Sequence, residues 1–482
     1  EFFDSAKFIV LLVVSLILLV LIALKFTLNN KVTITRTPLD IPLLIFVLVN
    51  FIASLASIDQ FGSFVGSQGK MWPAFFPLAT ITALYFLLTS NLKAKKQIDI
   101  ILWTLIGGTA VAAILAIFAY FGLFLPFDFA QIRSFNTLGI INRLAVLEAV
   151  VIPLTVSWSL FSHNKNIRIT ATVITLILAF SLVLTNIFSS YLIAAVGLGF
   201  LGIGSLKMSW NRAAQSSAAI LAVFFALFLI MRFVPQVANG TLKAWIINPP
   251  TGGEASIDVP KEATLSNKTS WDISTQAIGK RPLFGTGPST FMYAYTQLKP
   301  RYMNGTDQWA ARFDKSSSEF TEIMTTTGIF GTLAYLLVMT VILRFVWTLV
   351  FKSTQSSHYI PLASLVVSYI AASFVAPSSF ATTIPLFIAL AGLATLAKAT
   401  DENYVYDISV ELATLKGKLS WFPIGTSNDL IRTSPEGRGG KSQVFPTVFL
   451  VFVLLISAFA LNYQLKAYNA ELHYRKALLA SR

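Results

Sequence analysis

Twelve apolar runs, each close to the length of a bilayer-crossing helix, constrain this chain more than any other feature of its sequence. A helix needs roughly 20 apolar residues to cross the hydrocarbon core. The runs are continuous rather than alternating, which argues against strands, and charged residues form only 12% of the chain. The sequence therefore predicts an all-α polytopic membrane protein. We expect transmembrane helices over residues 8–28, 41–56, 72–88, 98–124, 138–161, 167–184, 191–206, 214–235, 328–351, 359–376, 380–397 and 444–461.

Lysine and arginine gather in alternate loops, and this alternation predicts the orientation. Short basic loops normally remain in the cytoplasm. The basic loops are 31–36, 93–96, 165–168, 207–212, the turn at Lys352, and 398–441. The other set is then external: 58–70, 125–137, the turn near Ser189, 236–317 and 377–379. We expect a multi-pass protein of the cytoplasmic (inner) membrane, with one long extracytoplasmic loop between helices 8 and 9.

This pattern divides the chain into five segments. They are 1–235 (helices 1–8), 236–317 (the external loop, with short helices over 262–279 and 288–298), 318–398 (helices 9–11), 399–443 (a cytoplasmic loop, with a short helix over 408–419) and 444–482 (helix 12 and the start of an external tail). Because the sequence opens on Glu1 rather than Met, we expect an upstream segment. Because the tail stops abruptly, we also expect a further region after Arg482.

Composition excludes several classes of function. The chain has no cysteine, which rules out disulfides and thiolate chemistry. Its three histidines, His163, His358 and His473, are isolated, so we expect no metal site and no cofactor. The net charge of +14 is scattered between apolar runs rather than gathered in a stripe, which favours contact with the lipid bilayer and predicts no nucleic-acid partner.

Ionisable residues within or beside spans are candidate functional groups. Glu148 lies near the middle of the fifth span, with Asn142 and Arg143 nearer its outer end. The alternative role for Arg143 and Glu148 is structural ion pairing with other helices. Glu319 and Glu322 share one face of the helical lead-in to the ninth span. Their alternative role is to favour the helix N-terminus, whose dipole attracts acidic groups.

The external loop is basic on balance and lies near Arg133. Arg and Lys clamps are the usual means of holding a diphosphate. The loop therefore suggests a site for an anionic head group. A merely solvated charged loop is the alternative.

Four stretches of the chain resemble motifs of the O-antigen ligase/O-antigen polymerase superfamily of GT-C-type membrane glycosyltransferases. They are Trp271 with 277–291 (AIGKRPLFGTGPSTF), 317–320 (SSEF) leading to 328–331 (GIFG), Arg133 with 139–145 (GIINRLA), and 185–197, which contains Ser189 and Ser190. Their order, their spacing and the position of the long loop also agree with the family.

The resemblance implies an activity and its partners. In that family, a glycan linked to undecaprenyl diphosphate is transferred outside the cytoplasmic membrane to a glycan or protein acceptor, without metal or nucleotide sugar. The expected partners are thus a polyprenyl-diphosphate-linked glycan donor and a glycan or protein acceptor. The protein must then supply a base for the acceptor hydroxyl and cations for the leaving diphosphate.

This sequence departs from the family pattern at three positions. Ser317 stands where the ligases place a catalytic histidine, Ser190 replaces an arginine, and the arginine expected before Trp271 falls near Asn267 or Lys268. Because serine is no base at neutral pH, Glu319 and Glu322 become the candidate catalytic residues. The candidate substrate-binding residues are Arg133, Asn142, Arg143, Lys268, Lys280, Arg281, Arg312, Lys315 and Ser317.

Three functions remain open from sequence. The first is an envelope glycan ligase, polymerase or protein glycosyltransferase. The second is a catalytically inactive relative that binds lipid-linked glycan or scaffolds an envelope complex. The third is a transporter or flippase, which is disfavoured because the sequence shows no internal repeat and no matching pair of broken spans.

Overall fold

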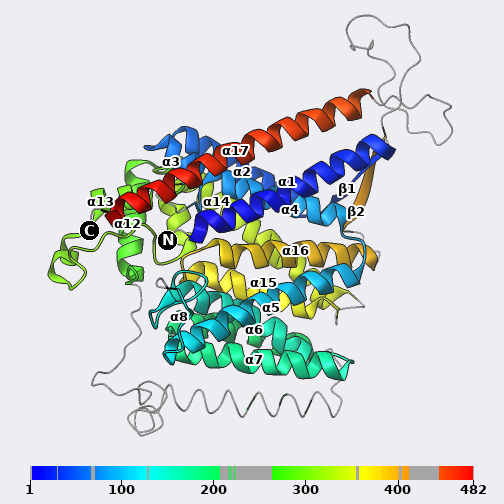
Figure 1. Ribbon diagram of the computed structural model, residues 1–482, viewed down its shortest axis with the longest axis horizontal. Helices are drawn as coiled ribbons and strands as arrows, with labels where there is room; N and C mark the ends of the chain where they lie inside the picture. The colour runs from blue at the N-terminus through cyan, green and yellow to red at the C-terminus, as the bar shows by residue number, and fades with distance from the viewer. Residues whose placement is uncertain are drawn as a thin grey trace, which may run out of the picture.

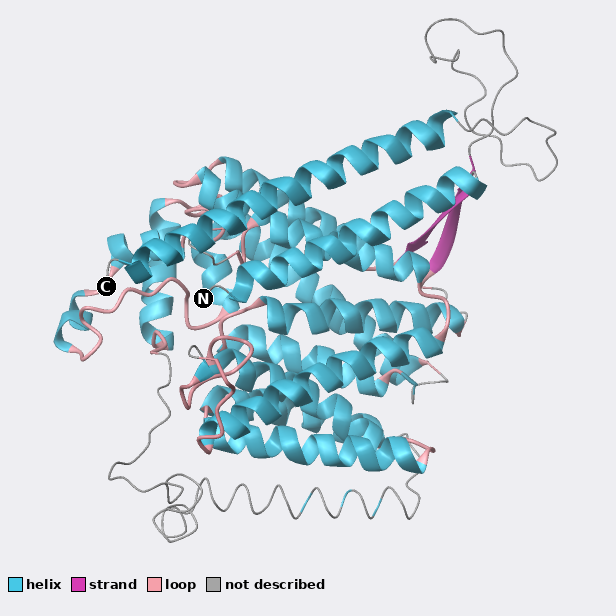
Figure 2. Ribbon diagram, viewed as in Figure 1, coloured by secondary structure: helices cyan, strands magenta, loops and turns pink. Residues whose placement is uncertain are grey.

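A bundle of helices running side by side makes up most of the protein (Figure 1, Figure 2). The computed structural model describes residues 3–29, 31–66, 71–127, 130–206, 215, 218, 222, 263–353, 358–400, 404–411 and 444–480. Eight helices are long and apolar enough to cross a membrane, and three shorter apolar helices accompany them. They match eleven of the twelve predicted spans; the remaining one, 214–235, falls almost wholly outside the described residues.

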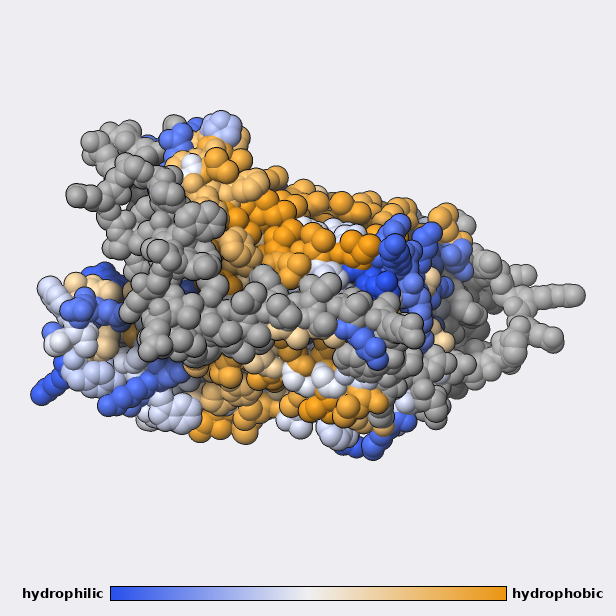
Figure 3. All heavy atoms as spheres, turned by 90° about the horizontal axis from the view of Figure 1, so that it is seen from below, coloured by the Kyte–Doolittle hydropathy of each residue, from blue (hydrophilic) through white to orange (hydrophobic). Residues whose placement is uncertain are grey.

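The bundle helices follow the apolar runs closely. They are α1 (Phe3–Asn29), α2 (Asp40–Leu55), α4 (Phe75–Asn91), α5 (Lys95–Tyr120), α6 (Ile141–Phe161), α7 (Lys165–Thr185), α8 (Phe188–Ser205), α14 (Glu319–Trp347, continued by the π-helical turn η3, Thr348–Lys352), α15 (Ile360–Val375), α16 (Phe380–Ala399) and α17 (Val444–Ala480). Seen from below, apolar side chains form a band across the middle of the molecule, with polar side chains at both ends (Figure 3).

Two helices form the centre of the bundle. Burial covers 89% of the apolar stretch of α6 and 83% of that of α16. Helices α7, α8 and α15 pack on α6, while α4, α5 and α15 pack on α16. By contrast, α1 and α17 pack on each other at the periphery, where few of their side chains are buried and the apolar ones are suited to face lipid.

Loops that were predicted to share a side of the membrane contact one another. At one end of the bundle, Ile58 N–H donates to Thr286 O (3.1 Å) and Lys315 Nζ donates to Ser378 O (2.7 Å). Both ends of the drawn chain lie at this same end (Figure 1). These contacts support the predicted grouping of loops, while the choice of which end is external stays a prediction.

A short sheet at the other end corrects one expectation. Strand β1 (Lys31–Arg36) pairs antiparallel with β2 (Tyr406–Glu411), so the helix predicted over 408–419 is wrong for residues 408–411. β1 carries four consecutive β-branched residues, 32–35, and β2 carries two at alternate positions, Ile408 and Val410. Such residues favour a strand once a partner is available. The partner lies far away in the sequence, and the local pattern does not reveal it.

The long loop contains a small core of its own. Its helices are α12 (Asn267–Lys280), α13 (Phe291–Leu298) and the 3₁₀ turn η2 (Arg301–Gly305), close to the two short helices that the sequence predicts. Nine buried apolar residues hold them together: Leu265, Ile273, Ala277, Phe291, Ala294, Tyr295, Leu298, Met303 and Phe313. The described part of the loop is therefore a packed unit, and α12 also packs on α14.

Helix α14 is broken at Gly328, where the ninth span was predicted to begin. Gly328 has a φ of 64° and a ψ of −158°, far from helical values. The loop segment 282–287 supplies hydrogen bonds to backbone groups on both sides of the break. The four bonds are Thr286 N to Thr325 O (3.3 Å), Gly287 N to Thr326 O (2.7 Å), Ile329 N to Pro282 O (2.8 Å) and Phe330 N to Leu283 O (3.3 Å).

Two glycines make this close approach possible. A Cβ on Gly285 would lie 2.6 Å from Thr325 O, and a Cβ on Gly328 would lie 2.7 Å from Gly285 N. Both residues also have a positive φ, which side chains rarely tolerate. Because broken helices at membrane depth need partners for their backbone groups, the loop segment completes α14 rather than merely covering it.

Candidate functional site

A polar cavity of about 590 Å³ lies between the loop core and the ends of the membrane helices. Ligand sites typically occupy about 300–1,000 Å³. One side, the membrane wall, has polar side chains from the bundle: Asn142, Arg143, Asn186, Ser189 and Ser378. The other side, the loop wall, has polar side chains from the long loop: Thr264, Asn267, Gln308, Asp314, Lys315 and Ser317.

Five helices begin at this polar cavity. Its lining includes Ile140 and Asn142 at the start of α6, Phe188 at the start of α8, Asn267 at the start of α12, Ser317 just before α14 and Ser378 just before α16. The N-terminus of a helix carries about half a positive charge and presents free N–H groups. Together with Arg143 and Lys315, these helix ends make the cavity suited to an anion.

Lys315 and Ser317 are held in fixed places by hydrogen bonds. The Lys315 ammonium donates to Ser378 O at 2.7 Å, which links the loop wall to the membrane wall. The backbone N–H of Ser317 donates to Ser270 Oγ of α12 at 2.9 Å. Ser317 is 7% exposed, and its Oγ has no hydrogen-bond partner among the described residues. This hydroxyl is therefore available to a ligand.

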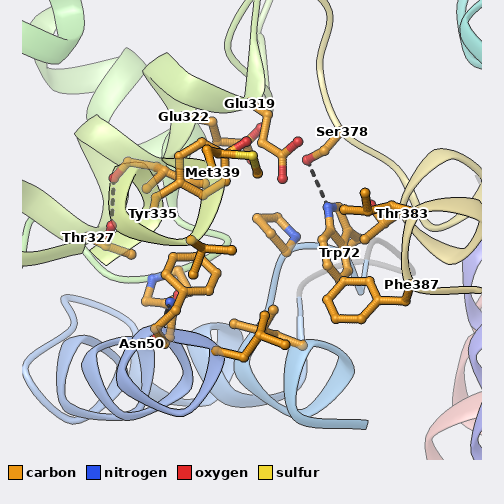
Figure 4. Close-up of a pocket in the computed structure, with 18 of the residues that line it drawn as sticks. Asn50, Trp72, Glu319, Glu322, Thr327, Tyr335, Met339, Ser378, Thr383 and Phe387 are labelled. Atoms are coloured by element: carbon orange, nitrogen blue, oxygen red, sulfur yellow. Dashed lines mark hydrogen bonds between the residues drawn. The ribbon is translucent and has the colours of Figure 1, made fainter. Parts of the chain in front are cut away.

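A second cavity, which is apolar and small, lies behind the first. It measures about 50 Å³ and lies among α2, α4, α14, α15 and α16. Its few polar lining side chains include Asn50, Glu319, Glu322, Tyr335 and Tyr369. Figure 4 shows Glu319 and Ser378 near each other at one side of this apolar cavity and Asn50 at the opposite side.

The two predicted catalytic carboxylates come from the first turn of α14 and are buried. Ser318 caps this turn by accepting a hydrogen bond from Thr321 N–H. Glu319 is 7% exposed, and its Oε2 accepts a hydrogen bond from Tyr369 Oη at 2.9 Å. Glu322 is 1% exposed, and its Oε2 has no hydrogen-bond partner in the described chain. Capping alone does not explain two carboxylates buried this deeply.

The two cavities are adjacent and share one turn of the chain. Ser378, in the turn between α15 and α16, lines both of them. Its Oγ accepts a hydrogen bond from Trp72 Nε1 at 2.8 Å, and the backbone N–H of Glu319 donates to Ala376 O at 3.1 Å. Glu322 lies within electrostatic reach of Lys315 and Arg143 and also of the acidic Asp314 and Glu319. The carboxylates of Glu319 and Glu322 thus lie close to the cations Arg143 and Lys315, with a single layer of polypeptide between the two cavities.

The structure brings together four of the nine predicted substrate-binding residues. Asn142, Arg143, Lys315 and Ser317 all line the polar cavity. The remaining five do not: Arg133 lines a separate pocket of about 20 Å³, and Lys268, Lys280, Arg281 and Arg312 are exposed outside the lining. Lys268 lies 5.2 Å from the centre of the Tyr302 ring, a cation–π contact.

Sequence reasoning missed several groups at the site. Tyr369 carries no motif, and Trp72 was read only as part of a span. Asp314, which the sequence does not single out, lines the polar cavity beside the cations. Its position next to Lys315 is the only local signal that pointed to it.

Glu148 belongs to a different part of the bundle. It is fully buried in α6 and lines neither of the two cavities. Within the described residues, no group of three acidic or histidine side chains is arranged to hold a metal ion.

This geometry defines a class of protein. It is a polytopic helical membrane protein with a polar, cationic cavity beneath a long loop between two membrane helices. A family model described as O-antigen ligase matches residues 173–336, which include the long loop, the loop wall and the first half of α14. This part of the chain is therefore similar to the O-antigen ligase family. No curated protein matches the chain.

Proposed function

We propose that this protein transfers a glycan from a polyprenyl-diphosphate carrier to a glycan or protein acceptor at the external face of the cytoplasmic membrane. The observation that carries the proposal is the polar cavity, where two cations, five helix N-termini and the unpartnered Ser317 hydroxyl converge at the end of the bundle. A diphosphate carried on a membrane-embedded lipid would meet the protein at this depth.

The diphosphate is held by Arg143, Lys315 and Ser317. Charge-assisted hydrogen bonds from such groups are about twice as strong as neutral ones. In the reaction, an acceptor hydroxyl oxygen forms the new bond to the anomeric carbon, while the bond from that carbon to the diphosphate oxygen breaks. Negative charge grows on the leaving diphosphate, and the two cations stabilise it in place.

The proton of the acceptor hydroxyl needs a base, and we assign this role to the α14 carboxylates. Glu319 and Glu322 are the buried acids adjoining the polar cavity, and Tyr369 orients Glu319. A general base must come within hydrogen-bond reach of the hydroxyl, directly or through one water. Because both carboxylates line the apolar cavity, the acceptor must approach past the Ser317–Ser378 boundary.

The test is a transfer assay with the purified full chain in lipid nanodiscs, an undecaprenyl-diphosphate-linked oligosaccharide and envelope glycans or proteins as acceptors. Appearance of the glycan on an acceptor supports the proposal. Tight donor binding without transfer to any acceptor would instead support the inactive relative, which binds the lipid-linked glycan without acting on it.

A further inference from the structure

The two walls of the polar cavity differ in chemistry. The membrane wall carries Arg143. Lys315 comes from the loop wall, and its ammonium contacts the membrane wall by donating a hydrogen bond to Ser378 O. The loop wall contributes neutral polar side chains, among them Thr264, Asn267 and Gln308, as well as the charged Asp314 and Lys315. Positive charge is concentrated where the loop meets the bundle, and Thr264, Asn267 and Gln308 supply uncharged hydrogen-bonding groups on the remainder of the loop wall.

Rigid parts of the loop core hold the neutral groups. Asn267 is the first residue of α12, whose start is capped by Ser266 Oγ accepting from Thr269 N at 3.1 Å. Gln308 lies in a turn in which its carbonyl accepts from Ala311 N at 3.0 Å. The buried Leu265 anchors the chain just before α12. The positions of both amides are thus set before a ligand arrives.

Both amide side chains are open to a partner. Neither has a hydrogen bond to another residue in the part of the chain that the structure describes. An amide offers two donors and an acceptor, and a sugar ring presents hydroxyls that both donate and accept. Carboxamides and hydroxyls on a rigid wall therefore suit a pyranose better than they suit a second phosphate.

We propose that Thr264, Asn267 and Gln308 form a sugar subsite that recognises the carrier-proximal sugar of the donor. This inference rests on the proposed function. With the diphosphate at the cations, the attached sugar extends away from the bilayer and along the loop wall. The three side chains then decide which sugar the protein accepts, because a site built to hydrogen-bond a hydroxyl rejects ligands that lack it.

The experiment separates the sugar from the diphosphate. The full chain in nanodiscs is titrated with citronellyl diphosphate, which carries no sugar, and with the same lipid diphosphate bearing glucose, galactose or N-acetylglucosamine. Asn267→Ala and Gln308→Ala are each expected to weaken binding of the best glycosylated probe about tenfold, the loss expected for one hydrogen bond. Binding of citronellyl diphosphate should not change.

A matched control and a second variant complete the design. Gln276→Ala removes an exposed amide of α12 that does not line the cavity and should change neither affinity. Thr264→Val keeps the side-chain shape and tests the same subsite if an amide variant does not fold.

Two failures are distinguishable. If the amide variants weaken both probes equally, or neither, the sugar subsite is wrong while the donor site stands. If citronellyl diphosphate does not bind the wild type, or binds Arg143→Ala equally well, the donor site fails and the sugar subsite fails with it.

Discussion

Tyr369 of α15 donates a hydrogen bond from its phenol to Glu319 Oε2 at 2.9 Å, which ties the first turn of α14 to the neighbouring membrane helix. Both residues are buried, at 2% and 7% exposure. A carboxylate fixed in this way has one defined orientation. The contact distinguishes Glu319 from Glu322, whose Oε2 has no partner among the described residues.

The first prediction concerns this pair of residues. Glu319→Gln should abolish transfer and leave donor binding intact, because the amide keeps the shape of the side chain and removes its basicity. Ser317→Ala should cost much less in turnover. Tyr369→Phe should lower kcat without changing donor affinity, because it frees the carboxylate to rotate. Wild-type turnover in Glu319→Gln, measured with the lipid-linked oligosaccharide, would show that the base is another group.

The second prediction concerns the donor cations. Arg143→Ala and Lys315→Ala should each weaken binding of the lipid diphosphate by about 1.5–3 kcal/mol, the range for hydrogen bonds to charged groups. Lys268→Ala and Arg281→Ala should have little effect, because these residues do not line the polar cavity.

The control for this series is Arg301→Ala, which removes an exposed arginine of the loop outside that cavity. Equal losses in Arg143→Ala and Arg301→Ala would mean that only the overall charge of the loop matters. Titrations at two salt concentrations report this difference, since screening weakens exposed charges more than partly buried ones.

The third prediction concerns the break in α14. Gly328→Ala and Gly285→Ala should each destabilise the protein by at least about 1–3 kcal/mol, the usual cost of a strained backbone conformation. The added Cβ would also meet backbone atoms at 2.7 Å and 2.6 Å. Gly279→Ala is the matched control, because its Cβ would have open space within α12. In detergent, the thermal unfolding temperature should be lower for Gly328→Ala and Gly285→Ala than for Gly279→Ala.

The fourth prediction concerns orientation. Because the chain contains no cysteine, a single introduced cysteine reports its side unambiguously. Thr306→Cys in the long loop should react with an impermeant thiol reagent on intact cells, and Asn166→Cys in the first turn of α7 should react only after lysis. Both positions are exposed in the structure. The reverse pattern would invert the topology and place the polar cavity inside.

The fifth prediction concerns the β1–β2 sheet. Partial burial by itself raises the pKa of Asp407, but the hydrogen bonds from Lys398 and Thr35 and the charge of Lys398 outweigh it and hold the pKa below its ordinary value of 3.8. The carboxylate thus stabilises the sheet above pH 3.8, and this contribution is lost as the pH falls through the lower, folded-state pKa. The protection factors of the β1 amides, which correct for the pH dependence of intrinsic exchange, should fall with acidification in the wild type. In Asp407→Asn, the β1 amides should exchange faster than in the wild type at neutral pH, and their protection should depend less on acid. Identical pH profiles in the two proteins would contradict the stabilising role of the Asp407 carboxylate.

The sequence predicted the helices well because hydropathy is a local property. Each span needs only its own apolar residues, and Gly328 already marked the start of the ninth. The resemblance also led to Asn142, Arg143 and Ser317, and the basic balance of the long loop led to Lys315; these four residues do converge. Patterns tied to the bilayer and to short motifs were thus sufficient for the fold and for part of the site.

The remaining features depend on contacts between distant segments. Tyr369 lies 50 residues from Glu319, and nothing near it in the sequence indicates its partner. The loop amides Asn267 and Gln308 meet the cations only because the loop core places them there. Lys268 in α12 and Arg281 directly after it carry the expected charge, but both side chains are exposed.

The pairing of segment 282–287 with the break in α14 has a consequence for the order in which the protein is made. The two partners are separated by about forty residues, so they leave the ribosome in quick succession and can join before α15 exists. Tyr369 and Ser378 are synthesised later. In the nascent chain, the backbone of α14 would therefore reach its final form while the Glu319 carboxylate still lacks its hydrogen bond from Tyr369. The site would be complete only after α15 and α16 have been made and have packed beside α14.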